Sequence, residues 1–152
     1  MHRFYDPNIA TTLQLSEEES KHCVRVLRLT EGDEIEVVDG AGNLYLCKIA
    51  MAHPKRCAVE IVERKECPPH WGHQIVLCVA PTKNLDRMED MADRVTEMGV
   101  DRIIPLLCRN SERKVLKTER IQKILVSAMK QSLKAQLPQL DELTPFKQLM
   151  QM

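Results

Sequence analysis

Aromatic residues are scarce in this chain of 152 residues, at 3% of the composition. Stacking of bases on aromatic rings therefore cannot be its main source of affinity for a nucleic acid. Glycine is scarce too, since there are five and none follows Gly99. A nucleotide cofactor held by the backbone needs glycines that let the main chain approach it closely, and the second half of the chain offers no such loop.

Long apolar runs and paired cysteines are also missing. No run approaches the length of about 20 residues that spans a membrane, and the N-terminus lacks the apolar segment of a secretion signal. The six cysteines form no C-x-x-C pair, and several lie inside apolar runs, as buried thiols do in a reducing compartment. The sequence predicts a cytoplasmic protein without a membrane segment.

Charge is balanced overall but not along the chain. Lys and Arg number 22, as do Asp and Glu, so the formal net charge is zero. Residues 102–134 nevertheless hold two acidic residues, Glu112 and Glu119, against nine basic ones: Arg102, Arg109, Arg113, Lys114, Lys117, Arg120, Lys123, Lys130 and Lys134. Such an excess attracts a polyanion, although a solvated helix face is the commoner outcome.

Short strands joined by tight turns are predicted in the first part of the chain. Ser16 and Glu19 form a capping-box pattern that begins a short helix ending near Leu29. Alternating apolar residues then predict strands at 34–38, 44–51 and 56–62, with a hairpin turn at 39–43. These elements predict a small β-barrel with a core of Ile35, Val37, Ile49, Val59 and Ile61.

Residues 67–73 break all periodicity and contain two consecutive prolines. We predict a linker here, between one domain at 1–66 and a second at 74–152. The stretch also offers Cys67, His70 and His73 as zinc ligands, but a fourth ligand is not evident and the spacing matches no standard site. No metal site is predicted.

Apolar runs alternate with helical patterns in the second domain. Strands are predicted at 74–80 and 102–107, and helices at 84–98 and 118–136. Two strands and part of a third unit do not complete a doubly wound sheet, whose ligands bind at the carboxyl ends of its strands. The chain therefore reads as a β-barrel followed by the first half of an α/β domain. Its uncovered apolar sheet surface favours a dimer.

Four residues define the ends and irregularities of these elements. Pro105 cannot donate to a ladder, so we predict an edge strand or a bulge at that position. Thr118 is expected to cap the second helix and Pro138 to end it. Thr144, followed by a proline, is expected to cap a third helix.

Several motifs follow one another in a fixed order. They are His22-x-x-Arg25-Val26-Leu27-Arg28, Lys83 with Arg87-Met88, Glu97-x-Gly99-Val100, Arg109-x-Ser111-Glu112-Arg113, and Ala128 with Gln131-Ser132. In this order they resemble the bacterial SPOUT-class methyltransferases that modify N3 of a uridine in small-subunit (16S) ribosomal RNA. The resemblance covers essentially the whole chain.

The resemblance implies a PUA-like RNA-binding barrel and an α/β domain of the SPOUT class that ends in a trefoil knot. It also implies S-adenosylmethionine as methyl donor, and a homodimer with the active site at its interface. The family's Gly-Pro-Glu-Gly-Gly loop and Leu-Arg-x-Glu-Thr segment, which bind the cofactor, are not in this sequence. We therefore expect the chain to lack the knot and the cofactor-binding residues, and to be inactive alone. Arg94 stands where the family usually has lysine.

An RNA-binding role is predicted for eight residues, whereas no catalytic residue is assigned. Arg25 and Arg28, three apart on the short helix, should share a face and contact neighbouring phosphates. The alternatives are a solvated basic face for these arginines, a structural role for His22, and an ion pair with Arg94 for Glu97. The eight residues are His22, Arg25, Arg28, Lys83, Arg87, Arg109, Ser111 and Arg113.

The expected reaction is attack of a deprotonated uridine N3 on the methyl group of the sulfonium donor. Nearby cations would stabilise the N3 anion. The alternative function is a non-catalytic RNA-binding module or a ribosome assembly factor.

Overall fold

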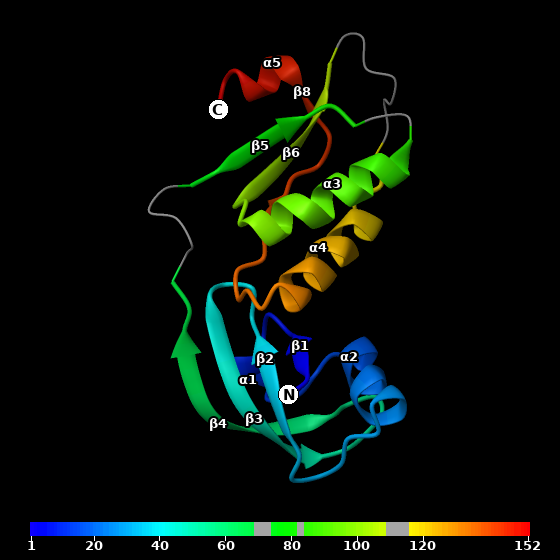
Figure 1. Cartoon of the computed structure of the whole chain (residues 1–152), viewed down its shortest axis with the longest axis vertical. Helices are drawn as coiled ribbons and strands as arrows, with labels where there is room; N and C mark the ends of the chain where they lie inside the picture. Colours follow the sequence, from blue (N-terminus) through cyan, green and yellow to red (C-terminus); the bar gives the residue numbers. More distant parts are fainter. Residues whose placement is uncertain (69–73, 82–83, 109–115) are drawn as a thin grey trace. The chain divides into compact units, whose positions relative to one another are not determined.

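The computed structural model describes residues 1–68, 74–81, 84–108 and 116–152. The chain divides into two compact units (Figure 1). Unit 1 comprises Met1–Pro68 together with Lys134–Gln136, and unit 2 comprises Pro69–Leu133 together with Leu137–Met152. Each unit has its own apolar core.

A four-stranded sheet forms the centre of unit 1. Its order is β1 (Arg3–Tyr5), β2 (Glu34–Val38), β3 (Asn43–Met51) and β4 (Ala58–Glu66). β1 runs parallel to β2, and the other two pairings are antiparallel. The predicted strands are confirmed for β2 and β3, while β4 begins and ends later than 56–62 and β1 was not predicted. Among the described residues β1 and β4 do not pair, so the sheet is not a closed barrel.

The core of unit 1 contains the predicted residues. Ile35, Val37, Ile49 and Val59 are buried, and the partly buried Ile61 packs against them. The other buried members of the cluster are Phe4 of β1, Ile9 of the short helix α1 (Ile9–Thr12), Leu15, Tyr45 and three cysteines, Cys23, Cys47 and Cys57.

That helical segment begins as predicted. The Ser16 side chain accepts a hydrogen bond from the Glu19 amide and begins α2 (Glu17–Lys21). The Glu19 carboxylate also accepts from the Tyr5 amide at 2.9 Å, which fastens α2 to β1. The helix then continues as a π-helix, η1 (His22–Val26), and is capped at Leu27 rather than near Leu29.

The hairpin between β2 and β3 receives a distant segment of the chain. Ala41 forms an antiparallel bridge with Gln136, and the Gly42 amide donates to the Ala135 carbonyl at 3.0 Å. Gly42 has φ +99°, and a Cβ added there would lie 3.2 Å from the Cys67 carbonyl oxygen. Both the positive φ and the close approach of this carbonyl require glycine at position 42. No pattern in the sequence indicates that residues 134–136 belong to unit 1.

Unit 2 is built on parallel strands with helical connections. β5 (Val76–Val79) pairs with β6 (Arg102–Leu107), and β6 pairs in turn with the two-residue strands β7 (Gln139–Leu140) and β8 (Thr144–Pro145). α3 (Leu85–Met98) connects β5 to β6. The Asn84 side chain caps its first turn, and Gly99, with φ +99°, caps its end.

Helices α3 and α4 (Glu119–Gln131) share one core with the sheet. Met88 and Ala92 of α3 and Ile121 and Leu125 of α4 are buried together with Ile103 of β6. This burial explains the apolar stripes that predicted both helices. No helix in the described parts of the chain is long and apolar enough to cross a membrane.

Pro105 lies in the central strand, so the prediction of an edge strand is wrong. β7 pairs with Arg102 and Ile103 and β8 with Leu106 and Leu107, which leaves a break between them. The Asp141 amide donates to the Ile103 carbonyl, and alternation along the strand turns the Pro105 nitrogen to the same side. The ladder is thus interrupted where the proline lacks its N–H.

Helix ends were predicted less well than helix faces. α4 ends at Gln131 and not at Pro138, because Ser132 caps it and Leu133 adopts a left-handed φ of 58°. Thr118 stands at the N-cap position, but its hydroxyl donates to Glu142. The cap of α5 (Phe146–Leu149) is Pro145, one residue after the expected Thr144, whose hydroxyl donates to the Glu142 carbonyl.

Candidate nucleic-acid interface

Four exposed basic residues of unit 1 lie at the end of α2, on η1 and just after it. Lys21, His22, Arg25 and Arg28 are all exposed. The Leu27 amide donates to the His22 carbonyl at 2.9 Å, which closes the wider π turn. Arg28 lies beyond this turn with φ +55°, a left-handed conformation that is uncommon for a residue with a side chain. The prediction that Arg25 and Arg28 share a face of one helix is therefore wrong, since only Arg25 is helical.

The side chain of His22 packs against the ring of Phe4. Its imidazole meets Phe4 edge to face, with ring centroids 6.1 Å apart and planes at 67°. Phe4 is fully buried, whereas His22 is exposed. The histidine is therefore anchored but accessible, as a group that contacts a base would need to be.

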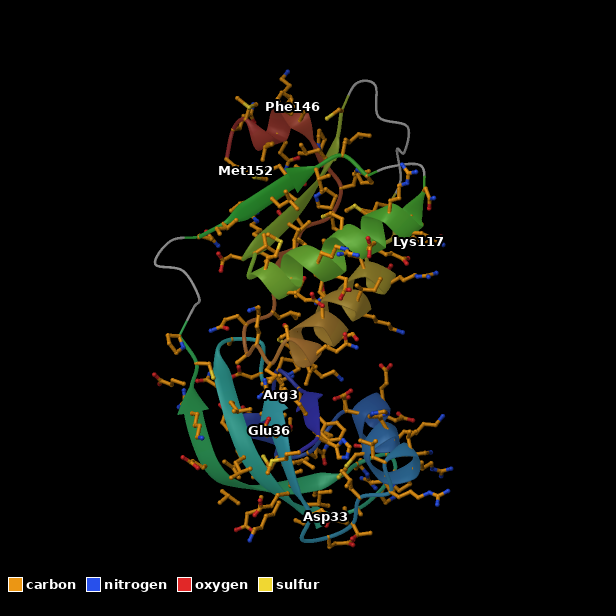
Figure 2. The ribbon with its side chains drawn as sticks, in the orientation of Figure 1. Arg3, Asp33, Glu36, Lys117, Phe146 and Met152 are labelled. Atoms are coloured by element: carbon orange, nitrogen blue, oxygen red, sulfur yellow. The ribbon has the colours of Figure 1, made fainter. Side chains whose placement is uncertain are left out.

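Most other described arginines are engaged by carboxylates. The ion pairs are Arg3–Glu36 (Figure 2), Arg64–Glu66, Arg94–Asp90, Arg102–Asp141 and Arg120–Glu89. Within the described ranges Arg25, Arg28, Arg56 and Arg87 form no ion pair. Three of these four belong to the predicted RNA-binding set. Arginines without carboxylate partners remain available to phosphate oxygens.

Buried contacts fix η1 to the sheet. The Ser20 hydroxyl donates to the Leu15 carbonyl at 3.1 Å and accepts from the Cys57 amide at 2.9 Å. Cys23 is fully buried, and a hydrogen bond to Cys57 together with burial raises the pKa of its thiol. These links join α2 and η1 to the residue that precedes β4. The basic residues of η1 thus project from a supported element.

Only some of the remaining predicted residues lie in the described parts of the chain. Arg87 is exposed on the first turn of α3. Arg94 pairs with Asp90 at 3.2 Å, so the expected pair with Glu97 is wrong. His70, His73, Lys83, Arg109, Ser111 and Arg113 lie outside the described residues.

Unit 2 shows a second, structural set of charges. Arg102 binds Asp141 through two hydrogen bonds of 3.0 and 2.6 Å, and so ties β6 to the residue after β7. The hydrogen bond from Arg102 lowers the pKa of the Asp141 carboxyl below its usual value. Arg120 of α4 reaches Glu89 of α3 at 2.6 Å. Two arginines of the basic stretch at 102–134 are therefore neutralised in place.

Described residues of unit 2 do not form a backbone cradle for a nucleotide-like cofactor. The carboxyl ends of β5 and β6 are where a parallel sheet binds such a group. Among the described residues of unit 2 the only glycine is Gly99, which caps the far end of α3. Residues 82–83 and 109–115, which follow β5 and β6 at these ends, lie outside the described residues.

Two family models match the chain one after the other. A model described as RNA methyltransferase PUA domain matches residues 15–62, within unit 1. A model described as RNA methyltransferase domain matches residues 69–152, more than half of the chain.

Curated and solved relatives agree with these models. The chain is 34% identical over 139 residues to a ribosomal RNA small subunit methyltransferase E from Aquifex aeolicus, covering 87% of this chain and 58% of that protein. A probable rRNA-methyltransferase from Porphyromonas gingivalis is 35% identical, with a TM-score of 0.92 over 99% of this chain and 63% of its own. A putative methyltransferase from Legionella pneumophila, solved with bound S-adenosylmethionine, is 25% identical, with a TM-score of 0.86 over 98% of this chain and 65% of its own.

A PUA unit followed by an α/β unit that matches the methyltransferase model defines a class, the RNA methyltransferases that carry their own RNA-binding domain. Within this class the chain belongs to the ribosomal RNA small subunit methyltransferase E family, as the order of its motifs predicted. The chain spans a little over half the length of curated relatives that it matches, at 58% for the Aquifex aeolicus protein and 57% for one from Bacillus subtilis.

Proposed function

We propose that the protein takes part in S-adenosylmethionine-dependent methylation of N3 of a uridine in small-subunit ribosomal RNA. The 152 residues supply the RNA-binding unit and the first part of the catalytic domain. The residues that bind the methyl donor belong to the part of the relatives that this chain does not match. Alone, the chain binds RNA and transfers no methyl group.

One observation carries the RNA-binding part of this proposal. Arg25 lies on the supported π-helix η1 and Arg28 two residues after its end, and neither forms an ion pair in the described ranges. His22, on the same element, is exposed and packs on Phe4. Unpaired guanidinium groups bind phosphates, and an anchored imidazole can contact a base. The uridine N3 specificity is supported by the motif order, from His22 to Ser132.

We also propose that the protein acts in the cytoplasm as a homodimer, with its active site completed by the second copy. The support for the dimer is the apolar surface of unit 2: Val76 of β5 and Phe146 and Met150 at the C-terminal end are 41, 51 and 70% exposed. Sedimentation velocity of the 152-residue chain and of the protein extended to the length of its relatives tests this. A monomer in both would contradict it.

RNA binding is tested first, on the purified 152-residue chain. Fluorescence anisotropy with transcripts of small-subunit ribosomal RNA is measured over a series of salt concentrations. Because phosphate contacts release counterions, log K should fall linearly with log salt, by about 0.7 per neutralised phosphate on single-stranded RNA. An affinity that does not depend on salt, or no binding, contradicts the proposal.

Methyl transfer is tested with the same RNA and a methyl-labelled donor. We expect no incorporation by the 152-residue chain and stoichiometric incorporation by the extended protein. Methylation at N3 blocks the Watson–Crick edge of the uridine, so reverse transcription should stop one nucleotide before it. Incorporation of the methyl label without a stop of reverse transcription would show that an atom other than N3 is methylated. No incorporation by the extended protein, with RNA binding retained, would favour the alternative of a binding module or assembly factor.

A further inference from the structure

Arg56 is the one unpaired arginine of unit 1 that the motifs do not include. It lies with Lys55 in the turn between β3 and β4, and both side chains are exposed. Neither forms an ion pair with a described residue. Lys55 and Arg56 are thus exposed and without ion pairs, as Arg25 and Arg28 are, and they differ in this from the arginines that are paired with carboxylates.

The contacts of Cys57 place this turn beside η1. The Cys57 amide donates to the Ser20 hydroxyl of α2 at 2.9 Å, and its carbonyl accepts from the Leu15 amide at 2.9 Å. Cys57 and Cys23 are fully buried in the same apolar cluster, and their thiols share a hydrogen bond. Arg56 directly precedes Cys57, and Arg25 lies two residues after Cys23, so both arginines flank one buried contact. Figure 1 shows α2 next to the beginning of β4.

Hydrogen bonds within the turn hold it in one conformation. The amides of Lys55 and Arg56 both donate to His53 Nδ1, at 3.1 and 3.3 Å. The Ala52 amide donates to the Glu31 carboxylate at 2.9 Å. A turn that is already ordered loses less conformational entropy when it binds a ligand.

Glu31 is hydrogen-bonded to a residue just before the turn. Glu31 accepts from Ala52, and this hydrogen bond lowers the pKa of its carboxyl, so it is charged at neutral pH. It forms no ion pair with Lys55 or Arg56 among the described residues. Lys55 and Arg56 thus have no carboxylate partner among the described residues, although α2, which Cys57 contacts, carries Glu17, Glu18 and Glu19 in its first turn.

We propose that Arg56, assisted by Lys55, binds phosphates of the RNA strand that η1 contacts, and so extends the interface from η1 onto the turn between β3 and β4. The inference rests on the proposed RNA-binding function. Phosphate contacts of this kind fix the position and register of the RNA and do not read its sequence.

The test compares Arg56→Gln with Arg64→Gln in the 152-residue chain, using the anisotropy and salt series described above. Arg64 is a matched control, since it is exposed in the same unit but paired with Glu66 and hydrogen-bonded to Asn43. We expect Arg56→Gln to weaken binding several-fold and to reduce the slope of log K against log salt by about 0.7. Arg64→Gln should match the parent, and Arg56→Lys, which keeps the charge, should retain the slope.

Each outcome of this test has one meaning. An Arg56→Gln variant with the affinity and slope of Arg64→Gln overturns the inference, provided that Arg25→Gln weakens binding. A parent chain that does not bind RNA overturns the proposed function itself. Urea unfolding of each variant separates a lost contact from a lost fold, and Arg56→Gln should keep the midpoint of the parent because the side chain is exposed.

Discussion

Helices α3 and α4 of unit 2 and the η1 region of unit 1 both expose arginines, but in different states. On α3 and α4, Arg94 and Arg120 are held by Asp90 and Glu89, whereas Arg87 of α3 forms no ion pair with a described residue. On and after η1, Arg25 and Arg28 have no carboxylate partner among the described residues. The basic excess of the sequence, at residues 102–134, includes α4 but neither α3 nor η1. Ion pairing thus separates Arg94 and Arg120 from Arg25 and Arg28, a difference that the charge along the chain does not predict.

The largest effect is expected from the shared core of α3 and α4. Leu125 is fully buried between these helices and the sheet, so Leu125→Ala should lower the free energy of unfolding of unit 2 by about 2–5 kcal/mol. Urea unfolding followed by circular dichroism measures this. RNA affinity should be unchanged if unit 1 carries the binding. Met98→Ala, at a side chain that is 70% exposed, is the control and should stay within about 0.5 kcal/mol.

Arg25→Gln and Arg94→Gln compare the two regions directly. Loss of one charged phosphate contact at Arg25 should weaken RNA binding about tenfold, which corresponds to about 1.4 kcal/mol. Arg94→Gln should leave the affinity within about twofold of the parent, because its guanidinium already binds Asp90. Equal losses of RNA affinity in Arg25→Gln and Arg94→Gln would show that an ion pair does not keep an arginine from binding RNA.

The ion pair of Arg102 with Asp141 makes unit 2 sensitive to acid. Since the pKa of Asp141 is lowered in the folded chain, its stabilising contribution is present above the usual carboxyl value of 3.8 and is lost as the pH falls below it. The urea midpoint of the parent should therefore fall more between pH 6 and pH 3 than that of Asp141→Asn. Glu97→Gln, at an exposed residue of α3, should behave as the parent does. Equal falls for the parent and Asp141→Asn would contradict this role.

The smallest effect is expected at Glu31. Its carboxylate accepts from Ala52 near the basic turn, and Glu31→Gln removes a negative charge that opposes the approach of RNA. We expect affinity to rise by about twofold at low salt and the gain to shrink above 0.1 M salt, where the Debye length is about 10 Å. Glu60→Gln, on β4, is the matched control. A loss of affinity at Glu31 would show that the carboxylate supports the turn more than it repels RNA.

Periodicity in the sequence predicted the elements that bury one face over several residues. β2, β3, β6 and α3 fall at the predicted positions, give or take one residue. β1 was missed because it has three residues and is defined by parallel pairing with a strand some thirty residues later. The end of α4 was missed because it depends on Leu133 and on the pairing of residues 134–136 with a hairpin in unit 1.

The candidate interface was predicted in composition but not in geometry. The motif identified His22, Arg25 and Arg28, and a helical spacing was assumed for them. The π-helix and the left-handed conformation of Arg28 change which side chains share a face. Neither feature can be predicted from the periodicity of the sequence. Arg56 was not predicted, because its place beside η1 depends on a hydrogen bond between residues 37 positions apart.

The segment at residues 134–136 determines when unit 1 can finish folding during synthesis. Gln136 donates to the Cys67 carbonyl, 69 positions earlier, and bridges Ala41 still further back. The fold of unit 1 therefore cannot be complete when only the first 68 residues have left the ribosome. Its last contacts form after α4 has been synthesised. Contacts of such long sequence separation form late and slow folding. A nascent chain stalled before residue 134 should consequently expose the Gly42 hairpin to proteases, and release beyond residue 136 should protect it.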